Sequence, residues 1–318
     1  MDYRGIRVLV TGPSGFLGTP LCEGLVREGA RVRALVRPRS SPSWLDRSEL
    51  SAEIERFQGD VRAPDSLRAP VDGVDLVFHL AAQTSVPDSV RDPALTLQTN
   101  VVGTQNLLEA ARRAQARVVL ASSSQVYGQA LYSPIDEAHP LQARSPYAAS
   151  KIAQEALVQA WSASFGLRAT VLRTFFTYGP RQSLASVVPA VVCQLLDGPR
   201  LQLGNLYPQR DFVHVDDQVR GYLLAGASEG VDGRVINLAG PALVSIGGLV
   251  ERVGALLGVS PQVLEDPERV RSRGSELACV AGDSSLAAQL LGWRPEVAID
   301  EGLARTVDWY RQHRQLVT

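Results

Sequence analysis

No long hydrophobic run occurs in the 318 residues of the chain: nowhere do roughly 18 apolar residues follow one another, as a membrane-spanning helix would require. The first residues, MDYRGIRVLVTG, enter an apolar β-rich run at once, without the charged segment and the long apolar segment of a signal peptide. We therefore expect neither a membrane partner nor secretion.

Cysteine and histidine are scarce as well. The three cysteines, Cys22, Cys193 and Cys279, lie far apart, and the four histidines are scattered. These spacings fit neither a disulfide framework nor a zinc site, so we expect no metal and a location in the reducing cytoplasm. A net charge of −1 likewise leaves no basic field, so nucleic acid is not expected as a partner.

What the first half does contain is an alternation of short apolar runs with amphipathic segments. The strand-like runs are Arg7–Val10, Val32–Val36, Ile54–Gln58, Leu76–Leu80, Val118–Ser122 and Thr170–Arg173. The segments whose apolar residues recur at helical spacing are Leu17–Glu28, Asn100–Arg113 and Tyr147–Phe165. Short, nearly all-apolar strands separated by helices are typical of a parallel sheet that is covered on both faces. The pattern predicts a Rossmann-type, doubly wound α/β domain over residues 1–178.

The pattern loosens over residues 179–318, where proline and glycine interrupt separate helical stretches. These stretches are Val187–Leu196, Val215–Ala227, Gly247–Leu257 and Ile299–Gln312. We expect a smaller, mixed α/β lobe here that binds the substrate. The strand-like runs Arg210–Val213 and Val235–Leu238 fit either lobe, so an exchange of elements between the two lobes is expected.

A glycine-rich turn follows the first strand-like run. Gly12, Gly15 and Gly18 in TGPSGFLG permit a tight turn, a close approach of the backbone to a phosphate, and close packing of helix on sheet. The free N–H groups at the start of the next helix would face a pyrophosphate. A strand before, a helix after and a second strand near residue 32 favour a dinucleotide site over a purely structural turn.

The end of the second strand-like run bears on which dinucleotide binds. An acidic residue normally stands there to bind the adenosine ribose, but here Arg37 follows Val36. A guanidinium pairs with a 2′-phosphate that an acid would repel, so we favour NADP(H) over NAD(H); a solvated basic loop is the alternative. Asp60, after the third run, is a candidate for the adenine edge of either cofactor.

Tyr147 and Lys151 lie one turn apart on one face of a predicted helix. A phenol is a poor base at neutral pH, and a neighbouring ammonium lowers its pKa by stabilising the phenolate. Such a pair can accept the proton of a substrate hydroxyl while a nicotinamide takes the hydride. Taken alone, a Tyr-x-x-x-Lys pair is more often a surface pair. Its position after the glycine turn and after SSSQVYG (Ser122–Gly128) favours catalysis.

Several motifs in order carry a resemblance that covers almost the whole chain, from Ile6 to about Tyr310. They are TGPSGFLG, HLAA (His79–Ala82), TNVVGTQNLLEAAR, SSSQVYG, SPYAASK and RDFVHVDD (Arg210–Asp217). Together they resemble the extended short-chain dehydrogenase/reductase family, and within it the NAD(P)-dependent nucleotide-sugar epimerases and dehydratases. The chain looks most like hexosamine 4,6-dehydratases and the GDP-mannose dehydratases with their reductase relatives. The resemblance implies an enzyme that acts on a nucleotide-diphosphate sugar through a 4-keto intermediate.

The resemblance also assigns roles to single residues. Tyr147 would be the acid/base, Lys151 would bind the nicotinamide ribose and lower the tyrosine pKa, and Ser123 would hydrogen-bond the sugar 4-hydroxyl. Asn100 matches an asparagine near the cofactor, and a helix cap is its alternative role. The residues implied at the cofactor are Gly12, Ser14, Gly15, Phe16, Leu17, Gly18, Arg37, Asp60, Val61, Leu80, Ala81, Ala82, Asn100, Tyr147 and Lys151. The residues implied at the substrate are Ser85, Ser124, Gln125, Phe176, Arg210 and Arg271.

Three of these substrate positions carry further information. Arg210 and Arg271 match positions that grip the nucleotide diphosphate in relatives, and bidentate guanidinium contacts suit that anion. Structural salt bridges, for instance to Asp211 or Glu276, are the alternative. Phe176 stands where relatives mostly carry a substrate-contacting asparagine, which leaves the identity of the sugar open.

The residues after Ser123 bear on the reaction. Relatives that dehydrate take a general base for the C5 proton, and usually an acid, from the next two positions, which here are Ser124 and Gln125. An amide cannot take that proton. We therefore rank C4 epimerisation first, NADPH-dependent reduction of a 4-keto-6-deoxy sugar second, and 4,6-dehydration with a carboxylate from elsewhere third. Decarboxylation is a further alternative, and a regulatory nucleotide-binding relative without activity is another, which the presence of Tyr147 and Lys151 disfavours.

The resemblance finally implies a homodimer. In many relatives two helices of each subunit pack into a four-helix interface, and the corresponding segments are Asn100–Arg113 and Tyr147–Phe165. The apolar side chains Val158, Trp161 and Phe165 fit an intrasubunit core equally well.

Overall fold

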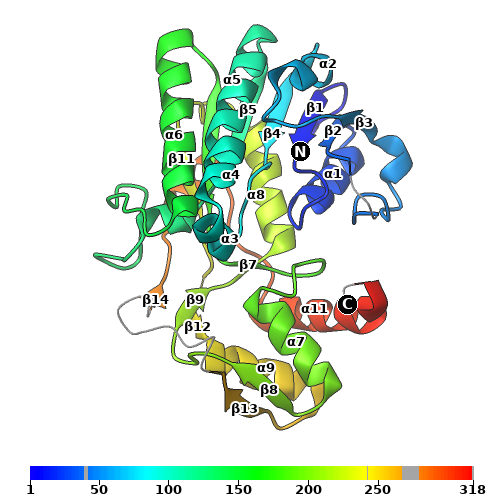
Figure 1. Cartoon of the computed structure of the whole chain (residues 1–318), viewed down its shortest axis with the longest axis vertical. Coiled ribbons are helices and arrows are strands. Elements are labelled where there is room, and N and C mark those ends of the chain that lie inside the picture. Colours follow the sequence, from blue (N-terminus) through cyan, green and yellow to red (C-terminus); the bar gives the residue numbers. More distant parts are fainter. Residues whose placement is uncertain (39–41, 242, 267–278, 317–318) are drawn as a thin grey trace.

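The computed structural model describes residues 1–38, 42–241, 243–266 and 279–316. Arg271, one of the predicted substrate residues, lies outside the described residues. Figure 1 shows a larger upper lobe built on the central sheet and a smaller lower lobe that holds the C-terminal helix.

A seven-stranded, all-parallel sheet forms the centre of the larger lobe, with the strand order β11-β6-β5-β4-β1-β2-β3. Its strands are β1 (Arg7–Thr11), β2 (Arg31–Val36), β3 (Glu55–Gln58), β4 (Leu76–His79), β5 (Arg117–Ser123), β6 (Ala169–Thr174) and β11 (Val235–Leu238). The predicted doubly wound class is confirmed. The seventh strand comes from the second half of the chain, where Val235 pairs with Val171 of β6.

Helices cover both faces of this sheet. The side chains of each strand point alternately to opposite faces, so both faces carry apolar side chains that must be buried. Val8 and Val10 of β1 enter one apolar core, and Leu9 between them enters the other. The first core is closed by α1 (Gly18–Arg27), α8 (Val215–Ala227) and α10 (Ser285–Leu291). The second core is closed by α2 (Arg68–Val71), α5 (Gly103–Arg113) and α6 (Pro146–Phe165).

Short elements connect these layers. They are α3 (Val86–Arg91), α4 (Pro93–Leu97), the π-helical turn η3 (Gln98–Val102), and the 3₁₀ turns η1 (Ser51–Glu53), η2 (Pro64–Leu67), η4 (Ser124–Tyr127) and η5 (Arg314–Leu316). Within the described part of the chain, no helix has the length and apolar character needed to cross a membrane.

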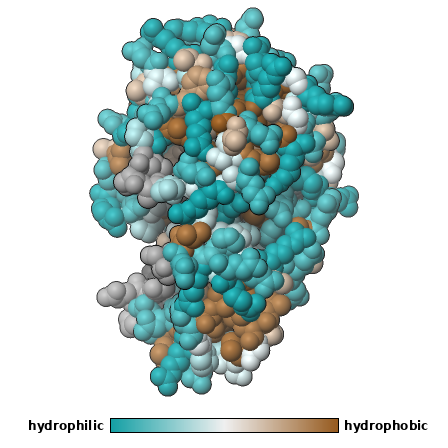
Figure 2. Space-filling model, turned by 90° about the vertical axis from the view of Figure 1, so that its right-hand side faces the viewer, coloured by the Kyte–Doolittle hydropathy of each residue, from teal (hydrophilic) through white to brown (hydrophobic). Residues whose placement is uncertain are grey.

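The smaller lobe has its own apolar core, which includes Leu195, Leu249 and Tyr310. Its helices are α7 (Val187–Asp197), α9 (Ile246–Leu257) and α11 (Ile299–His313). Its short strands are β7 (Thr177–Tyr178), β8 (Arg200–Leu203), β9 (Gln209–Asp211), β10 (Val213–His214), β12 (Leu243–Ser245), β13 (Gln262–Glu265) and β14 (Cys279–Val280). Figure 2 shows the face of the molecule that lies opposite α5 and α6, where apolar residues gather at the bottom, over this lobe.

Polar contacts tie the two lobes together. The carboxylate of Asp217 in α8 accepts hydrogen bonds from the backbone N–H groups of Glu296 and Val297 at 3.0 and 2.9 Å. Arg181, in the loop after β7, pairs at 3.1 Å with the buried Glu23 of α1. These contacts fix the position of the smaller lobe relative to α1 and α8.

Candidate active site

A cavity of about 1040 Å³ lies at the carboxyl ends of the parallel strands, where ligands of doubly wound folds bind. The glycine turn, the ends of β2, β3 and β4, and the start of α6 form its wall. The predicted cofactor residues that line it are Gly12, Ser14, Gly15, Phe16, Leu17, Gly18, Arg37, Asp60, Val61, Leu80, Ala81, Ala82, Tyr147 and Lys151. One wall therefore brings together every predicted cofactor residue but Asn100.

The glycine turn is closed too tightly for side chains at two of its positions. Gly12 has a φ of +71°, and a Cβ there would lie 2.9 Å from the backbone nitrogen of Ala81. A Cβ on Gly18 would overlap the carbonyl oxygen of Gly12. The helix α1 starts at Gly18 without an acidic residue in its first turn, so its positive end is available to an anion.

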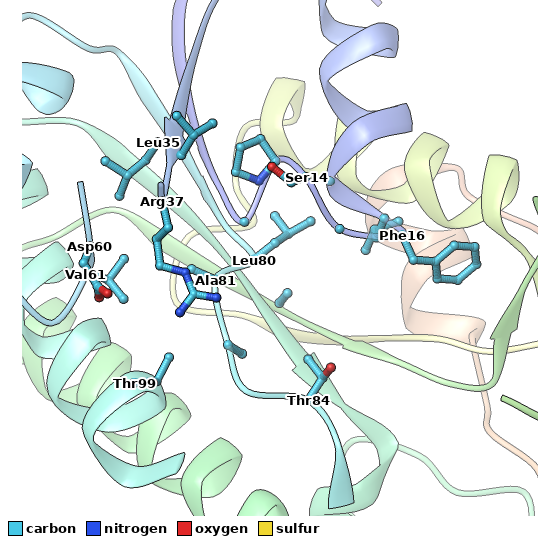
Figure 3. Close-up of a pocket in the computed structure, with 18 of the residues that line it drawn as sticks. Ser14, Phe16, Leu35, Arg37, Asp60, Val61, Leu80, Ala81, Thr84 and Thr99 are labelled. Atoms are coloured by element: carbon cyan, nitrogen blue, oxygen red, sulfur yellow. The ribbon is translucent and has the colours of Figure 1, made fainter. Parts of the chain in front are cut away.

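Charged side chains meet at one end of the cavity. Figure 3 shows Arg37 reaching from the end of β2 into the space between Asp60 and Val61 on one side and Ala81 on the other. Arg62 also lines the cavity and binds Asp60 through Nε and Nη2, the shorter contact being 2.7 Å. Hydrogen bonding to Arg62, assisted by the charge of Arg37, lowers the pKa of Asp60, so this end carries two cations and one carboxylate.

Tyr147 and Lys151 occupy the other end, and both are buried. Burial raises the pKa of Tyr147 to about 12, and a hydrogen bond with Ser123 offsets part of the rise. Lys151 donates from Nζ to the backbone oxygen of Ala121 at 2.7 Å, and Nζ lies 5.9 Å from the centre of the tyrosine ring. Burial therefore dominates the pKa of Tyr147 in this arrangement, and the lowering of that pKa by Lys151 stays a prediction.

The pKa of Lys151 is shifted as well. Burial lowers the pKa of Lys151 to about 8, although the charge of Glu155 opposes the shift. Glu155 lies one turn further along α6 and forms a buried ion pair with Arg173 of β6, at 2.6 Å. It also accepts a 2.5 Å hydrogen bond from Ser122. This buried pair holds α6, and with it Tyr147 and Lys151, against the ends of β5 and β6.

Asn100 does not line the cavity, and it does not cap a helix. It lies fully buried in the π-helical turn η3, where Oδ1 accepts from the Gln83 N–H and Nδ2 donates to the Gln83 carbonyl and to Ser150 Oγ. The alternative reading of Asn100 as a helix cap is therefore wrong, because its side chain instead joins the loop after β4 to α6. Ser85 has the capping role in this region: its Oγ accepts from the Asp88 N–H at the start of α3.

The predicted substrate residues that the structure describes do not belong to this cavity wall, although neighbours of several of them in the chain do, namely Thr84, Ser122 and Thr177. Ser123 Oγ accepts from the Gln125 N–H at 3.2 Å, which starts the turn η4 with Ser124 buried and Gln125 half-buried. Arg210 is 8% exposed, and its guanidinium carbon lies 5.0 Å from the centre of the Phe176 ring. Phe176 thus packs against the arginine that the family resemblance links to the diphosphate.

Sequence reasoning missed several residues of the cavity wall. They are Pro13, Leu35, Val36, Pro38, Gln58, Gly59, Arg62, Thr84, Thr99, Ala121, Ser122, Thr174, Thr177 and Tyr222. Most are the immediate sequence neighbours of a predicted residue, on one side or the other, so that proximity was a usable signal. Tyr222 is different, because it comes from α8 in the second half of the chain and carries no motif.

The fold and this site define a class, the extended short-chain dehydrogenase/reductases that act on nucleotide sugars. The family model of GDP-mannose 4,6 dehydratase matches residues 9–306. The chain therefore belongs to the nucleotide-sugar epimerase/dehydratase family, whose members are enzymes.

The relatives of this chain include enzymes named as dehydratases and enzymes named as epimerases. A dTDP-glucose 4,6-dehydratase of Streptomyces griseus is 36% identical over 96% of this chain and 94% of its own length. A UDP-glucose 4-epimerase of Mycolicibacterium smegmatis is 34% identical over 98% of this chain and 100% of its own. The solved dTDP-glucose 4,6-dehydratase DesIV of Streptomyces venezuelae, with NAD bound, has a TM-score of 0.87 and 31% identity, and covers 98% of both chains.

Proposed function

We propose that this chain binds a nicotinamide dinucleotide in the 1040 Å³ cavity and interconverts the C4 configuration of a nucleotide-diphosphate sugar. The residues fit the cofactor: two glycines leave no room for a Cβ at the turn, and a helix start without acids faces the cavity. Relatives of similar length include a UDP-glucose 4-epimerase, and a similar solved structure holds NAD.

In this proposal Tyr147 accepts the proton of the sugar 4-hydroxyl, to which Ser123 is hydrogen-bonded. A bound dinucleotide would supply the hydride acceptor for C4. Lys151 adds a cation, which favours the phenolate that burial disfavours. After the 4-keto sugar has turned over in the pocket and hydride has been returned to the opposite face of C4, Tyr147 would give the proton back to the C4 oxygen.

One observation carries the choice of epimerisation. Among the described residues of the cavity wall the acidic side chain is Asp60, which is bound to Arg62 at the end away from Tyr147. Nearby Glu155 is engaged with Arg173, and the loop after Ser123 offers Gln125. A dehydratase needs a base for the C5 proton beside the keto sugar. An epimerase needs no acid or base beyond Tyr147.

The decisive experiment supplies UDP-, GDP-, CDP- and dTDP-sugars, and their 4-keto-6-deoxy forms, with NAD(H) or NADP(H), and follows products by NMR. A changed C4 configuration without loss of water is the expected result. Loss of water from the nucleotide sugars would contradict the proposal in favour of dehydration.

Tyr147→Phe tests the acid/base on the substrate found in this way. We expect kcat to fall by roughly 10²- to 10⁴-fold, with a much smaller change in KM, because the proton acceptor is removed. Tyr132→Phe is the control, since the Tyr132 hydroxyl bonds Asp136 in an exposed loop. Undiminished turnover by Tyr147→Phe would exclude this residue as the acid/base.

Reduction of a 4-keto-6-deoxy sugar is the second candidate, and Arg37 favours it. A reductase consumes NADPH, and two arginines at the adenosine end suit a 2′-phosphate. In the substrate panel this activity would appear as stoichiometric oxidation of NADPH by 4-keto sugars. We propose NADP(H) as the preferred cofactor for the same reason.

Arg37→Ala tests that preference. We expect the Kd of NADPH to rise about 10- to 100-fold and the Kd of NADH to change little, because a charge-assisted bond to the 2′-phosphate is worth about 1.5–3 kcal/mol. Arg31→Ala, at the exposed start of the same strand, is the matched control. Equal Kd values for the two cofactors in the unaltered protein, with no effect of Arg37→Ala, would rule the preference out.

We also propose a homodimer through α5 and α6, and a cytoplasmic location. Exposed apolar residues next to these helices support the first, and three free cysteines the second.

A further inference from the structure

Lys151 is a cation that the fold keeps out of water. The residue belongs to the cavity wall and is 3% exposed. Its Nζ donates to the backbone oxygen of Ala121 at 2.7 Å, and that acceptor carries no net charge. Burial favours the neutral form of an amine, so a lysine that is to remain an ammonium in such a place needs a counter-charge.

Few charged or titratable groups surround Lys151. On α6 they are Tyr147 and Glu155, each one turn away from it. Burial, together with the charge of Lys151, lowers the pKa of His79 on β4 to about 3, so this imidazole is neutral. Glu155 and its partner Arg173 of β6 are ionised, and of these two it is Glu155 whose charge affects the pKa of Lys151. The charged side chains of α3 and α5, which also pack against α6, are partly exposed and paired with one another: Asp88, Arg91, Glu109, Arg112 and Arg113.

The carboxylate of Glu155 is fixed from two strands. Its Oε1 accepts from Ser122 Oγ at 2.5 Å and from Arg173 Nε at 3.0 Å, and its Oε2 accepts from Arg173 Nη2 at 2.6 Å. The residue is 2% exposed, so water screens its charge little. Ser122 follows Ala121 in β5, so one strand end holds both the ammonium and the carboxylate.

We propose that Glu155 is a positioning residue, which supplies the counter-charge that keeps Lys151 an ammonium in the cavity wall. This inference rests on the proposed function, in which the Lys151 cation favours the phenolate of Tyr147. A carboxylate bonded to Nζ would occupy its donors. Because the oxygens of Glu155 are taken by Arg173 and Ser122, its charge acts from a distance and leaves Nζ free to donate.

The charge of Lys151 can be observed directly, because it is the only lysine of the chain. Incorporation of isotope-labelled lysine gives one side-chain NMR signal, whose chemical shift reports protonation in a pH titration. Glu155→Gln keeps the shape of the side chain and removes its charge. Lys151 should then titrate about one pH unit lower or more, because a nearby opposite charge shifts a pKa by about 1–3. Glu155→Asp keeps the charge and should titrate near the unaltered protein.

Asp232→Asn is the matched control. The Asp232 carboxylate pairs at 2.8 Å with Arg117, an arginine at the start of β5 that is 8% exposed. Asp232→Asn and Glu155→Gln each deprive a buried arginine of its counter-ion, so both should lower the melting temperature. Only Glu155→Gln should change the titration of Lys151. Equal falls in the two variants would mean that loosened packing causes the shift, and would overturn the assignment.

A second variant keeps the test decisive if Glu155→Gln does not fold. Glu155→Gln/Arg173→Met removes the buried ion pair as a whole, which proteins often tolerate. Lys151 should again titrate below the unaltered value, because Glu155 is the charge that affects it. An unchanged titration in whichever of the two variants folds would overturn the assignment, and so would a fall in Glu155→Asp as large as in Glu155→Gln.

The pH dependence of turnover links the assignment to the reaction. On the substrate found with the panel of nucleotide sugars, the alkaline limb of kcat/KM should move to lower pH in Glu155→Gln by the same amount as the titration of Lys151. An alkaline limb that stayed in place would overturn the role in the reaction. If the unaltered protein bound no dinucleotide, the proposed function would fail, while the NMR titration would still decide whether Glu155 maintains the charge of Lys151.

Discussion

Asp211 is the residue whose burial has the clearest consequence for pH dependence. It is 1% exposed at the end of β9; Oδ2 accepts from the Gly282 N–H at 2.9 Å, and Oδ1 has no partner among the described residues. Burial raises its pKa to about 7, and the bond from Gly282 opposes part of the rise. The folded protein therefore holds a proton on Asp211 over a range in which the unfolded chain has lost it.

The sign of the effect follows from linkage. Between the unfolded pKa of 3.8 and the folded pKa of about 7, the folded state binds a proton that the unfolded state has lost. The free energy of unfolding therefore falls as the pH rises from about 4 to about 7. Asp211→Asn should therefore become progressively more stable than the unaltered protein across that range, by roughly 4 kcal/mol at about 1.36 kcal/mol for each pKa unit. Urea unfolding at several pH values measures the difference.

The exposed Asp308, paired with Arg311, supplies the control for this experiment. Asp308→Asn should show a nearly constant difference in unfolding free energy over the same range. A pH-independent difference for Asp211→Asn would show that Asp211 is ionised throughout.

At the scale of the element, two glycines in the turn from β1 into α1 allow effects on folding and effects on binding to be tested separately. Gly18→Ala places a Cβ on the Gly12 carbonyl, so we expect a loss of at least 1–3 kcal/mol in unfolding free energy. At Gly15 a Cβ would meet its nearest neighbour at 3.4 Å, so Gly15→Ala should keep the stability within about 1 kcal/mol. Because Gly15 lines the cavity, that variant should still weaken NADH binding.

Chemical unfolding and NADH titration of both variants check this prediction. Gly15→Ala with unchanged NADH affinity would contradict the proposed close approach of a phosphate to this turn.

Elements of the larger lobe were predictable because their signals are local. All six strands of the first half end within one residue of their predicted bounds, and all but the edge strand β3 (ERFQ) are short, largely apolar runs. The helix expected from Asn100 instead begins with the π-helical turn η3, where the Asn100 side chain is hydrogen-bonded to Gln83 and Ser150. Partners from distant loops decided that geometry, and a local pattern does not contain them.

In the candidate site, too, some features could be predicted from the local sequence and others depend on the tertiary structure. Gly12 and Arg37 directly follow strands that the apolar pattern already marks, Gly18 lies at the start of the next helix, and all three line the cavity. The high pKa of Tyr147 was not predictable, because it depends on how deeply the phenol is buried. Tyr222 has the pattern of an ordinary core residue of an amphipathic helix, and only the tertiary structure places it in the cavity wall, with no partner for its hydroxyl among the described residues.

For the whole molecule, the arrangement of exposed apolar side chains bears on assembly. Leu97, Val102 and Phe165 are 45%, 44% and 55% exposed, and they lie on α4, η3 and α6, which Figure 1 shows grouped on one side with α5. Val158 is buried in the intrasubunit core, so the outer apolar face is carried by other residues. Exposed large apolar side chains on neighbouring elements of one side of the molecule support the proposed dimer.

The double variant Leu97→Asp/Val102→Asp should convert the proposed dimer to a monomer, because carboxylates buried without partners cost several kcal/mol. Sedimentation velocity over a range of concentrations measures the change. Leu264→Asp, at a 51% exposed position of β13 in the smaller lobe, should leave the dimer intact. A monomeric unaltered protein would reject this interface.

The strand order of the sheet bears on how the chain can be made and divided. β6 is bordered by β11, so the parallel sheet lacks its last strand until residue 238 has left the ribosome. A fragment that stopped at residue 178 would expose β6 as an open edge and would strip Phe78 of its packing against α8. Residues 1–178 are therefore not expected to fold independently, and a chimaera joined at residue 178 would lack the edge strand β11 of the sheet.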